Sequence, residues 1–403
     1  MKIRKLTAVL VAACLALTAA GCGGNSTKGK YAFVTDTQGT DSTGGSALWQ
    51  GIKEVTDSGG IETGLFQATT DTAEGYAEAF AKAAEEKPGV VIAMGAPMEV
   101  PVYDAATLSN KFNYILFDGT THPEGGAASI PANVCCVKFA EHEEAFIAGY
   151  ASVCSGIKTL AVLVGEENEA NTRHVNGFVQ GVKKAAEDLA LESGSVTVSY
   201  EFAGSDELTP LRMSEALGLY NEGTSLIYTT GENLVMAVGM AARSQEKYYA
   251  TGGVDHTDDG KCLFSAVPVY NLAARLLLGD YAQGNFQGGA TVTYGYTDSC
   301  LQVKADFSTL ENFNQEKFDA IVSALMLGTV KPDEGIAPSN SNAVTVTRIE
   351  PKDAEAASAD AIAGGAIAPQ ETGAENTEGA ENAGGETAEG GEEAGATEGG
   401  EAA

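Results

Sequence analysis

The sequence predicts an α/β protein with two lobes, each a mostly parallel sheet with helices between its strands. Short apolar runs of strand length alternate with segments of helical periodicity from residue 30 to residue 254, and a second series starts near residue 159. The runs are continuously apolar, as in Gly89–Gly95, which is typical of parallel strands buried on both faces. Because parallel strands need helical crossovers, two strand–helix series of similar length indicate two lobes of the same kind.

The first series begins directly after a short polar segment. Its expected strands are apolar runs bounded by Gly, Asp or Thr, and its expected helices carry an apolar face. In chain order we expect the strand Lys30–Thr35, the helices Ser46–Ser58 and Thr72–Lys87, the strands Gly89–Gly95 and Tyr114–Asp118, and the helix Glu141–Cys154. The last helix offers Ala145, Phe146 and Tyr150 to a core.

The second series repeats this pattern. Its expected strands are Thr159–Gly165, Val196–Glu201, Ser225–Thr230 and Tyr248–Val254, and its expected helices are Asn171–Leu189, Thr209–Asn221 and Asn233–Ser244. A helix near Val269–Leu278 and a segment of alternating character, Thr291–Val303, complete the folded body.

The N-terminus has the pattern of an export signal. Basic residues precede an apolar run over residues 6–20, and small residues then lead to Cys22. This pattern predicts a signal peptide over residues 1–21, since the run is too short for a stable membrane-spanning helix. Cys22 resembles the lipidation site of bacterial lipoproteins, which implies an exported protein anchored by lipid to the outer face of the cytoplasmic membrane. Residues 22–30 would be its polar tether, and plain secretion without a lipid is the alternative.

The segment 351–403 has the composition of a disordered acidic tail. It lacks aromatic residues and carries 13 acidic residues against one lysine, so it cannot bury enough apolar surface to offset the entropy lost on ordering. The whole chain has a net charge of −31, of which −22 remains on residues 22–350. An acidic body of this kind argues against binding to nucleic acid or flat binding to anionic lipid.

The sequence carries no pattern typical of an enzyme, a cofactor site or a metal site. Its four histidines stand outside the metalloprotease, nucleophile-elbow and phosphate-loop motifs. The five cysteines of the body are odd in number and show no CxxC spacing, which argues against zinc. Export permits one disulfide, but the sequence does not select its pair, and buried free thiols are the simplest interpretation.

Small or polar residues follow the expected strands in both series, at the strand ends where parallel sheets bind ligands. In the first series these residues are Asp36, Gly95 and Asp118, and in the second they are Gly165, Gly231 and Asp255. Two facing rims of this chemistry predict a binding site for a small polar solute. For any single aspartate the alternative is a helix cap or turn, but the repetition in both halves favours binding.

Several short motifs follow one another in a recognisable order. The most distinctive is Glu144–Ala151, and the others are Val34–Asp36, Trp49–Gly51, Val91–Gly95, Ile115–Asp118, Asn133–Phe139, Gly177–Gly181, Thr230–Asn233 and Gly252–Asp255. In this order and spacing the chain resembles the BMP (basic membrane protein, PnrA-like) family of ABC-transporter substrate-binding lipoproteins. The resemblance covers roughly residues 30–346.

The resemblance implies two Rossmann-like lobes of a type I periplasmic-binding-protein fold, with crossing hinge strands between them. It implies a first lobe of residues 31–140 and 265–286 and a second lobe of residues 141–264 and 287–350. Such a protein closes on a solute without catalysing a reaction and delivers the solute to an ABC permease in the membrane.

The resemblance also implies a ligand and its contacts. Better-known members of the family bind purine nucleosides, with carboxylates on the ribose hydroxyls and aromatic rings on the base. By matching positions, the implied ligand-binding residues are Asp36, Asp41, Trp49, Gly95, Asp118, Gly231, Asn233 and Asp255. Carboxylates suit this role because each accepts two hydroxyl hydrogen bonds and discriminates against analogues that lack them.

The chain departs from the family pattern at positions that touch the ligand. Family members usually carry Ser-Phe-Asn after the residue at Asp41, where this chain has Thr-Gly-Gly at 43–45. Pro268 stands where the family has lysine, and Asp255 lacks the usual acidic neighbour. Loss of the aromatic ring alone would weaken purine binding by about 1–3 kcal/mol. A sugar receptor, a ligand sensor for a signalling partner and a surface interaction protein with a vestigial cleft are therefore the alternatives to a nucleoside receptor.

Overall fold

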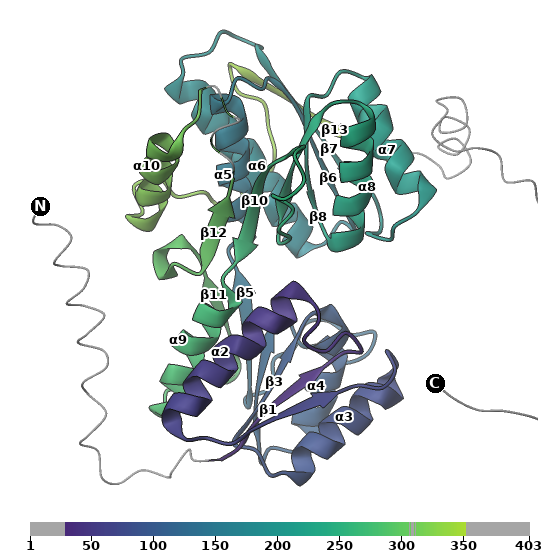
Figure 1. Cartoon of the computed structure of the whole chain (residues 1–403), viewed down its shortest axis with the longest axis vertical. Coiled ribbons are helices and arrows are strands. Elements are labelled where there is room, and N and C mark those ends of the chain that lie inside the picture. The colour runs from purple at the N-terminus through teal and green to yellow at the C-terminus, as the bar shows by residue number, and fades with distance from the viewer. Residues whose placement is uncertain (1–28, 306, 308–309, 311, 352–403) are drawn as a thin grey trace, which may run out of the picture.

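The computed structural model describes residues 29–305, 307, 310 and 312–351. The predicted signal peptide, the predicted lipidation site at Cys22 and nearly all of the predicted acidic tail lie outside these residues. The described chain folds into two lobes, each built around one sheet that is covered by helices (Figure 1). This architecture confirms the predicted α/β fold class.

The first lobe contains a six-stranded sheet in which every neighbouring pair of strands is parallel, in the order β11-β5-β4-β3-β1-β2. Its strands are β1 (Tyr31–Thr35), β2 (Thr63–Gln67), β3 (Val90–Met94), β4 (Asn113–Phe117), β5 (Val134–Phe139) and β11 (Ala290–Tyr294). Its helices are α2 (Thr43–Gly59), α3 (Ala73–Glu85), the 3-10 helix η1 (Ala96–Met98), α4 (Glu99–Leu108) and α9 (Tyr270–Ala282).

The second lobe contains a seven-stranded sheet in the order β12-β10-β9-β8-β6-β7-β13, with β10 and β12 antiparallel and the other pairs parallel. Its strands are β6 (Thr159–Val164), β7 (Val196–Phe202), β8 (Leu226–Thr230), β9 (Tyr248–Gly252), β10 (Cys262–Pro268), β12 (Leu301–Lys304) and β13 (Val344–Ile349). Its helices are α5 (Glu141–Cys154), α6 (Glu169–Asp188), α7 (Pro210–Asn221), α8 (Glu232–Ser244) and α10 (Gln315–Met326), and the 3-10 helix η2 (Tyr296–Asp298) lies at the junction of the lobes.

Apolar side chains cover both faces of each sheet. In β1 all five residues are buried, with Phe33 packed in the layer that contains α2 and α9. Its neighbours Ala32 and Val34 pack on the opposite face, in the layer that contains α3 and α4. Because side chains of a strand point alternately to the two faces, a strand covered on both sides is apolar at every position. This packing accounts for the continuous apolar runs in the sequence.

Polar residues determine where several helices begin. Helices α2, α3, α6 and α7 start after Ser42, Thr72, Asn168 and Thr209, and each of these side chains accepts a hydrogen bond from a backbone N–H in the first turn. Such a cap satisfies one of the N–H groups that the helix itself leaves without a partner.

The described chain passes between the lobes at three points. β5 leads into α5 through Ala140, β10 leads into α9 through Val269, and β11 leads through Gly295 and η2 to β12. β5 ends where the chain enters the second lobe, so its parallel neighbours in the first sheet end at the same edge. β10 and its parallel neighbours likewise end toward the first lobe. The carboxyl ends of the two sheets therefore face each other across the junction (Figure 1).

Two strands near the junction belong to a different lobe from the one that the expected boundaries give them. The expected first lobe includes residues 265–286, yet β10 pairs with β9 in the second sheet. The expected second lobe includes residues 287–350, yet β11 pairs with β5 in the first sheet. An apolar run indicates that a strand forms, whereas its partner depends on how the chain crosses between the lobes.

The structure also contains strands and α-helices that were not predicted from the sequence. These are β2, α4, β5, β10, α10 and β13. β2 and β13 are the outermost strands of their sheets, where one side of the strand has no neighbour and several residues are exposed. Such strands are less continuously apolar than central ones, so their signal in the sequence is weak.

Candidate binding site between the lobes

Three of the predicted site residues come together at the carboxyl edge of the first sheet. Asp36 follows β1, Gly95 follows β3 and Asp118 follows β4, and these strands are neighbours in the order β4-β3-β1. All three residues are half-buried. Polar groups from separate parts of the chain thus form one rim that faces the second lobe.

Asp36 holds the loop that follows β1. Its Oδ1 atom accepts hydrogen bonds from the backbone N–H groups of Gln38 and Gly39, at 3.0 and 3.2 Å. The same loop is tied to β2 by a hydrogen bond of 2.6 Å from Gln67 Nε2 to the Thr37 carbonyl. One oxygen of Asp36 is therefore engaged in the turn, which is the alternative role that any single aspartate at a strand end could have.

Asp118 is held in an unusual environment. Its backbone lies in the left-handed region with φ of 52°, and its Oδ2 atom accepts a hydrogen bond from the hydroxyl of Tyr270. Removal from water raises the pKa of Asp118 to about 7; the Tyr270 hydrogen bond opposes this rise and the charge of Glu141 adds to it. The carboxyl group thus changes charge near neutral pH, which is typical of residues at binding and catalytic sites.

Gly44 and Tyr270 lie side by side at the same rim. A Cβ atom built on Gly44 would lie 2.6 Å from Met94 Cε and 3.3 Å from Cε2 of the Tyr270 ring. The ring of Tyr270 packs edge-to-face on Phe139, with centroids 5.1 Å apart. The first turn of α2 therefore has no side chain at the point where Tyr270 approaches it.

A group of carboxylates begins α5, directly after the first crossing. Glu144 is only 1% exposed, and its Oε1 atom has no hydrogen-bond partner among the described residues. Burial raises the pKa of Glu144 well above its usual range, and the charges of Glu141, Asp118 and Glu143 raise it further. The hydroxyl of Tyr296, also buried, has no partner among the same residues. The junction therefore encloses polar groups that the described structure leaves unsatisfied.

Arg173 of α6 neutralises part of this negative charge. Its guanidinium binds both carboxylate oxygens of Glu141, at 2.9 and 3.3 Å, and Glu169 at 2.6 Å. Glu169 also lies 3.3 Å from Lys138 Nζ of β5, so the network reaches from the second lobe to the first. Glu144 takes no part in these ion pairs.

The second lobe presents its predicted site residues differently. Gly231 adopts φ of 79° between β8 and α8, and Asn233 is exposed in the first turn of α8. Asp255 is engaged by Lys304, at 2.5 Å from Nζ to Oδ2, and by the hydroxyl of Thr257 at 2.8 Å. Burial raises the pKa of Asp255, but the hydrogen bonds from Lys304 and Thr257 outweigh burial and lower it overall. Asp255 therefore already has a cationic partner.

Trp49 and Asp41 lie on either side of the start of α2. Trp49 is half-buried and stacks on Phe33 of β1, with centroids 6.0 Å apart and an interplanar angle of 16°. Its ring packs against the apolar core of the first lobe. Asp41 is exposed in the turn that precedes α2. The described contacts of Trp49 are thus contacts of packing.

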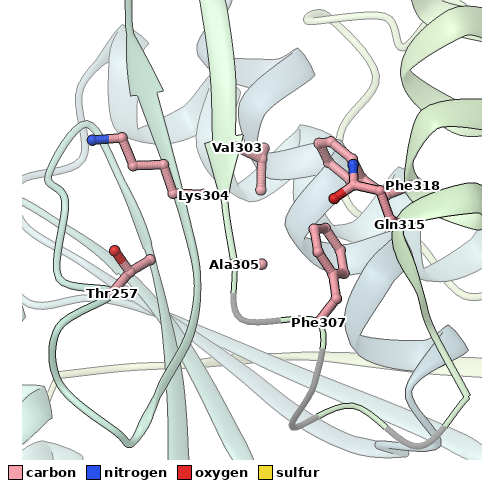
Figure 2. Close-up of a pocket in the computed structure, with 7 residues that line it drawn as sticks. All are labelled: Thr257, Val303, Lys304, Ala305, Phe307, Gln315 and Phe318. Carbon is pink, nitrogen blue, oxygen red and sulfur yellow. The ribbon is translucent and has the colours of Figure 1, made fainter.

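A separate pocket of about 460 Å³ lies in the second lobe beside β12 (Figure 2). In this view Lys304 and Thr257 lie on one side of β12, and Phe307 and Phe318 lie on the other (Figure 2). All of its lining residues belong to the second lobe: Thr257, Val303, Lys304, Ala305, Phe307, Gln315 and Phe318. It is thus distinct from the rim that carries Asp36, Gly95 and Asp118.

The described cysteines form neither a disulfide nor part of a metal-ligand cluster. All five described cysteines are buried and unpaired, and the described chain has no cluster of three or more His, Cys, Asp or Glu that could hold a metal ion. Over the same residues, no helix is both long and apolar enough to cross a membrane.

Sequence reasoning missed Tyr270, Glu144 and Tyr296 as members of the junction. Tyr270 follows the apolar run Cys262–Pro268, which is a crossing strand, so its position after that run is a signal that could have identified it. Glu144 lies in the most distinctive motif of the resemblance, but a glutamate in the first turn of a helix is normally a solvated residue.

Comparison with known proteins agrees with this geometry. The model of the Bmp family, described as "ABC transporter substrate-binding protein PnrA-like", matches residues 28–333. Among solved structures, a transcriptional activator of the comK gene from Bacillus halodurans is similar with a TM-score of 0.60 and 14% identity, over 76% of this chain and 100% of that one.

Two ABC transporter solute-binding proteins share the fold as well. The protein from Conexibacter woesei has a TM-score of 0.56 and 16% identity, over 76% of this chain and 98% of its own. The protein from Aeropyrum pernix has a TM-score of 0.53 and 16% identity, over 75% of this chain and 88% of its own. The chain belongs to the Bmp family of PnrA-like ABC transporter substrate-binding proteins, which are extracytoplasmic, bind small solutes, pair with a permease and catalyse no reaction.

Proposed function

We propose that this protein captures a nucleoside between its two lobes and delivers it to an ABC permease. The solute binds the rim of the first lobe, the lobes close about the crossing strands, and the closed form docks to the permease. Ligand binding shifts such a protein toward the closed form because the solute contacts both lobes only there.

The observation that carries this proposal is the pair of carboxylates, Asp36 and Asp118, at the edge of the first sheet. Both are half-buried, and both lie where the carboxyl ends of the two sheets face each other. Two carboxylates at one rim can accept hydrogen bonds from a pair of ribose hydroxyls, which water would otherwise satisfy. Gly95 lies between them, directly after the intervening strand β3, where the absence of a side chain lets a ligand approach the backbone.

The second rim would complete the site on closure. Gly231 and Asn233 begin α8 at the carboxyl end of β8, and Asp255 follows β9. For Asp255 to bind a solute, its ion pair with Lys304 would have to open or become part of the contact. Asp41 and Trp49 would contribute from the start of α2.

We further propose that Cys22 carries the lipid. A tether over residues 22–30 would hold the folded body beside the permease and raise its effective concentration there.

A sugar is the second candidate solute. Gly44 has no side chain and Pro268 is not a cation, so two of the contacts that the family resemblance leads one to expect for a purine are missing. The two carboxylates of the first rim would serve a polyhydroxylated sugar equally well.

Calorimetric titration of the exported chain with inosine, adenosine, hypoxanthine, ribose and arabinose tests these proposals. We expect inosine or adenosine to bind, and Asp118→Asn to weaken that binding by about 100-fold, as expected when a solute hydroxyl loses a charged acceptor. The matched control is Asp104→Asn, an exposed aspartate on α4. Binding of the sugars alone would favour the second candidate, and binding of none of the five compounds would refute both.

A further inference from the structure

The first turn of α2 and the first residue of α9 lie against each other at the rim of the first lobe. A Cβ atom on Gly44 would lie 2.6 Å from Met94 Cε, and 3.3 Å from Cε2 and 3.6 Å from Cζ of the Tyr270 ring. Both Gly44 and Tyr270 are half-buried, as is Asp118, whose carboxylate accepts a hydrogen bond from the Tyr270 hydroxyl. An aromatic ring therefore stands over a position that the sequence leaves without a side chain.

We infer that Tyr270 is the residue that determines solute specificity in this protein, with its ring as the aromatic wall of the site and its hydroxyl as the group that orients Asp118. This inference rests on the proposed capture of a nucleoside. It assigns the contact with the flat face of the solute to α9, which follows the second crossing, rather than to the start of α2.

The structure holds Tyr270 firmly enough for this role. Phe139, the last residue of β5, packs edge-to-face against its ring at 5.1 Å. The hydroxyl is anchored on Asp118 Oδ2, so both ends of the side chain are restrained. A preorganised ring loses little conformational freedom when a solute binds, which favours affinity.

The location of Tyr270 also couples binding to closure. Val269 connects β10 of the second sheet to α9 of the first lobe, so Tyr270 is one residue away from a crossing. A rotation of the lobes about this crossing changes the approach of the second rim to the ring. The residue that contacts the solute thus lies beside one of the points where the lobes would move.

The effect of the Tyr270 hydroxyl can be measured as a change in the pKa of Asp118. Asp118 faces it directly, and Glu141 and Glu144 of α5 act on it through their charges. A hydrogen bond to the ionised form stabilises that form, so the Tyr270 hydroxyl holds the pKa of Asp118 below the value that burial alone would give. Tyr270→Phe removes this bond and leaves the ring in place.

Binding of inosine separates the two roles of the side chain. We expect Tyr270→Ala to weaken binding by about 10-fold or more, the contribution typical of one base–aromatic contact. Tyr270→Phe should keep most of the affinity at high pH, where Asp118 is ionised. As the pH is lowered, the variant should lose inosine at a higher pH than the wild type does, because the pKa of Asp118 is higher in the variant. Gly44→Phe combined with Tyr270→Ala should recover part of the affinity, because the new ring occupies the vacated space.

Tyr281→Phe provides the matched control. This tyrosine lies on the same helix, and its hydroxyl bonds to the Gly89 carbonyl at 2.7 Å, at the opposite end of the sheet. Its removal should change neither the affinity nor the pH profile. If the wild type binds inosine and Tyr270→Ala binds it equally well, the inference is wrong.

A measurement without solute distinguishes failure of this inference from failure of the proposed function. Carbon-13 NMR of labelled aspartate follows the titration of Asp118 in the wild type and in Tyr270→Phe. We expect a higher midpoint in the variant and an unchanged midpoint in Tyr281→Phe. If no tested nucleoside binds, the nucleoside proposal fails, and an unchanged Asp118 midpoint in Tyr270→Phe then overturns the role of Tyr270 independently.

Discussion

Buried Arg173 and half-buried Glu141 form a two-point ion pair where the chain first enters the second lobe. Arg173 Nε and Nη2 lie 2.9 and 3.3 Å from the two carboxylate oxygens of Glu141, and the arginine is 6% exposed. The pair links the start of α5 to α6. Through Glu169 the network continues to Lys138 of the first sheet.

Replacement of Arg173 by alanine should destabilise the protein strongly. The change leaves Glu141 without its main partner in a half-buried position, and a charged group left in this way costs about 1–3 kcal/mol. Urea unfolding measures the loss. Lys184→Ala, which breaks a partly exposed pair with Asp188 on the same helix, should cost about 0.5 kcal/mol or less. Equal effects of the two substitutions would mean that the Arg173 network stabilises the protein no more than the Lys184–Asp188 pair does.

Glycines allow α5 and α6 to approach closely, and Gly181→Ala should disrupt this contact. A Cβ atom on Gly181 would lie 2.0 Å from the Phe146 carbonyl oxygen, so the helices would have to move apart. We expect a loss of about 3 kcal/mol or more in the free energy of unfolding.

Gly279→Ala is the control for this prediction. Gly279 lies within α9, and a Cβ atom there would have no neighbour within 4 Å. The exchange should stabilise the protein by up to about 1 kcal/mol, because alanine has the higher helix propensity. A stable Gly181→Ala protein would show that the two helices can separate at little cost.

Asp118→Asn should stabilise the protein at neutral pH while weakening solute binding. Burial raises the folded-state pKa of Asp118 to about 7 from 3.8, so the folded state holds a proton that the unfolded state has already lost. Wild-type stability should therefore fall as the pH rises from about 4 to about 7. The asparagine variant removes this contribution, on the order of 1 kcal/mol for a half-buried group. Thermal unfolding between pH 4 and pH 8 measures the difference, which should vanish at the acidic end.

Glu144→Gln should likewise stabilise the protein at neutral pH. Glu144 is more deeply buried than Asp118. Burial raises the pKa of Glu144 well above 4.5, so wild-type stability should decline as the pH rises above the ordinary carboxyl range. Glutamine carries no charge, and the variant should lose this decline. Glu85→Gln, at an exposed position on α3, should leave the pH profile as in the wild type. A wild-type profile retained in Glu144→Gln would mean that Glu144 is ionised throughout.

The central strands and their order along the chain were predictable because burial on both faces leaves a strong signal. β3 and β6 appear in the sequence as unbroken apolar runs, and helices such as α3 and α7 begin at the polar residues that cap them. The partners of β10 and β11 were not predictable. Both strands lie next to a crossing between the lobes, so each could join either sheet. The local sequence does not encode which sheet each strand joins.

The candidate site was predictable only as a set of strand-end residues. The rule that parallel sheets bind ligands at their carboxyl edges identified Asp36, Gly95 and Asp118, and the strand order places them side by side. Nothing local to Asp118 reveals Tyr270, which lies 152 residues further along the chain. The engagement of Asp255 by Lys304 likewise depends on a contact across 49 residues.

The sequence by itself determined the α/β class, the two lobes and the starts of helices such as α3 and α7, since periodicity, burial and capping act within a few residues of one another. It also determined the family, because the motifs keep their order. Only the tertiary structure decided which strand joins which sheet, that Tyr270 stands where Gly44 leaves space, and that Glu144 is buried. These features depend on the relative placement of segments far apart in the chain. The free energy of each such residue depends on contacts with these distant segments, which the local sequence does not determine.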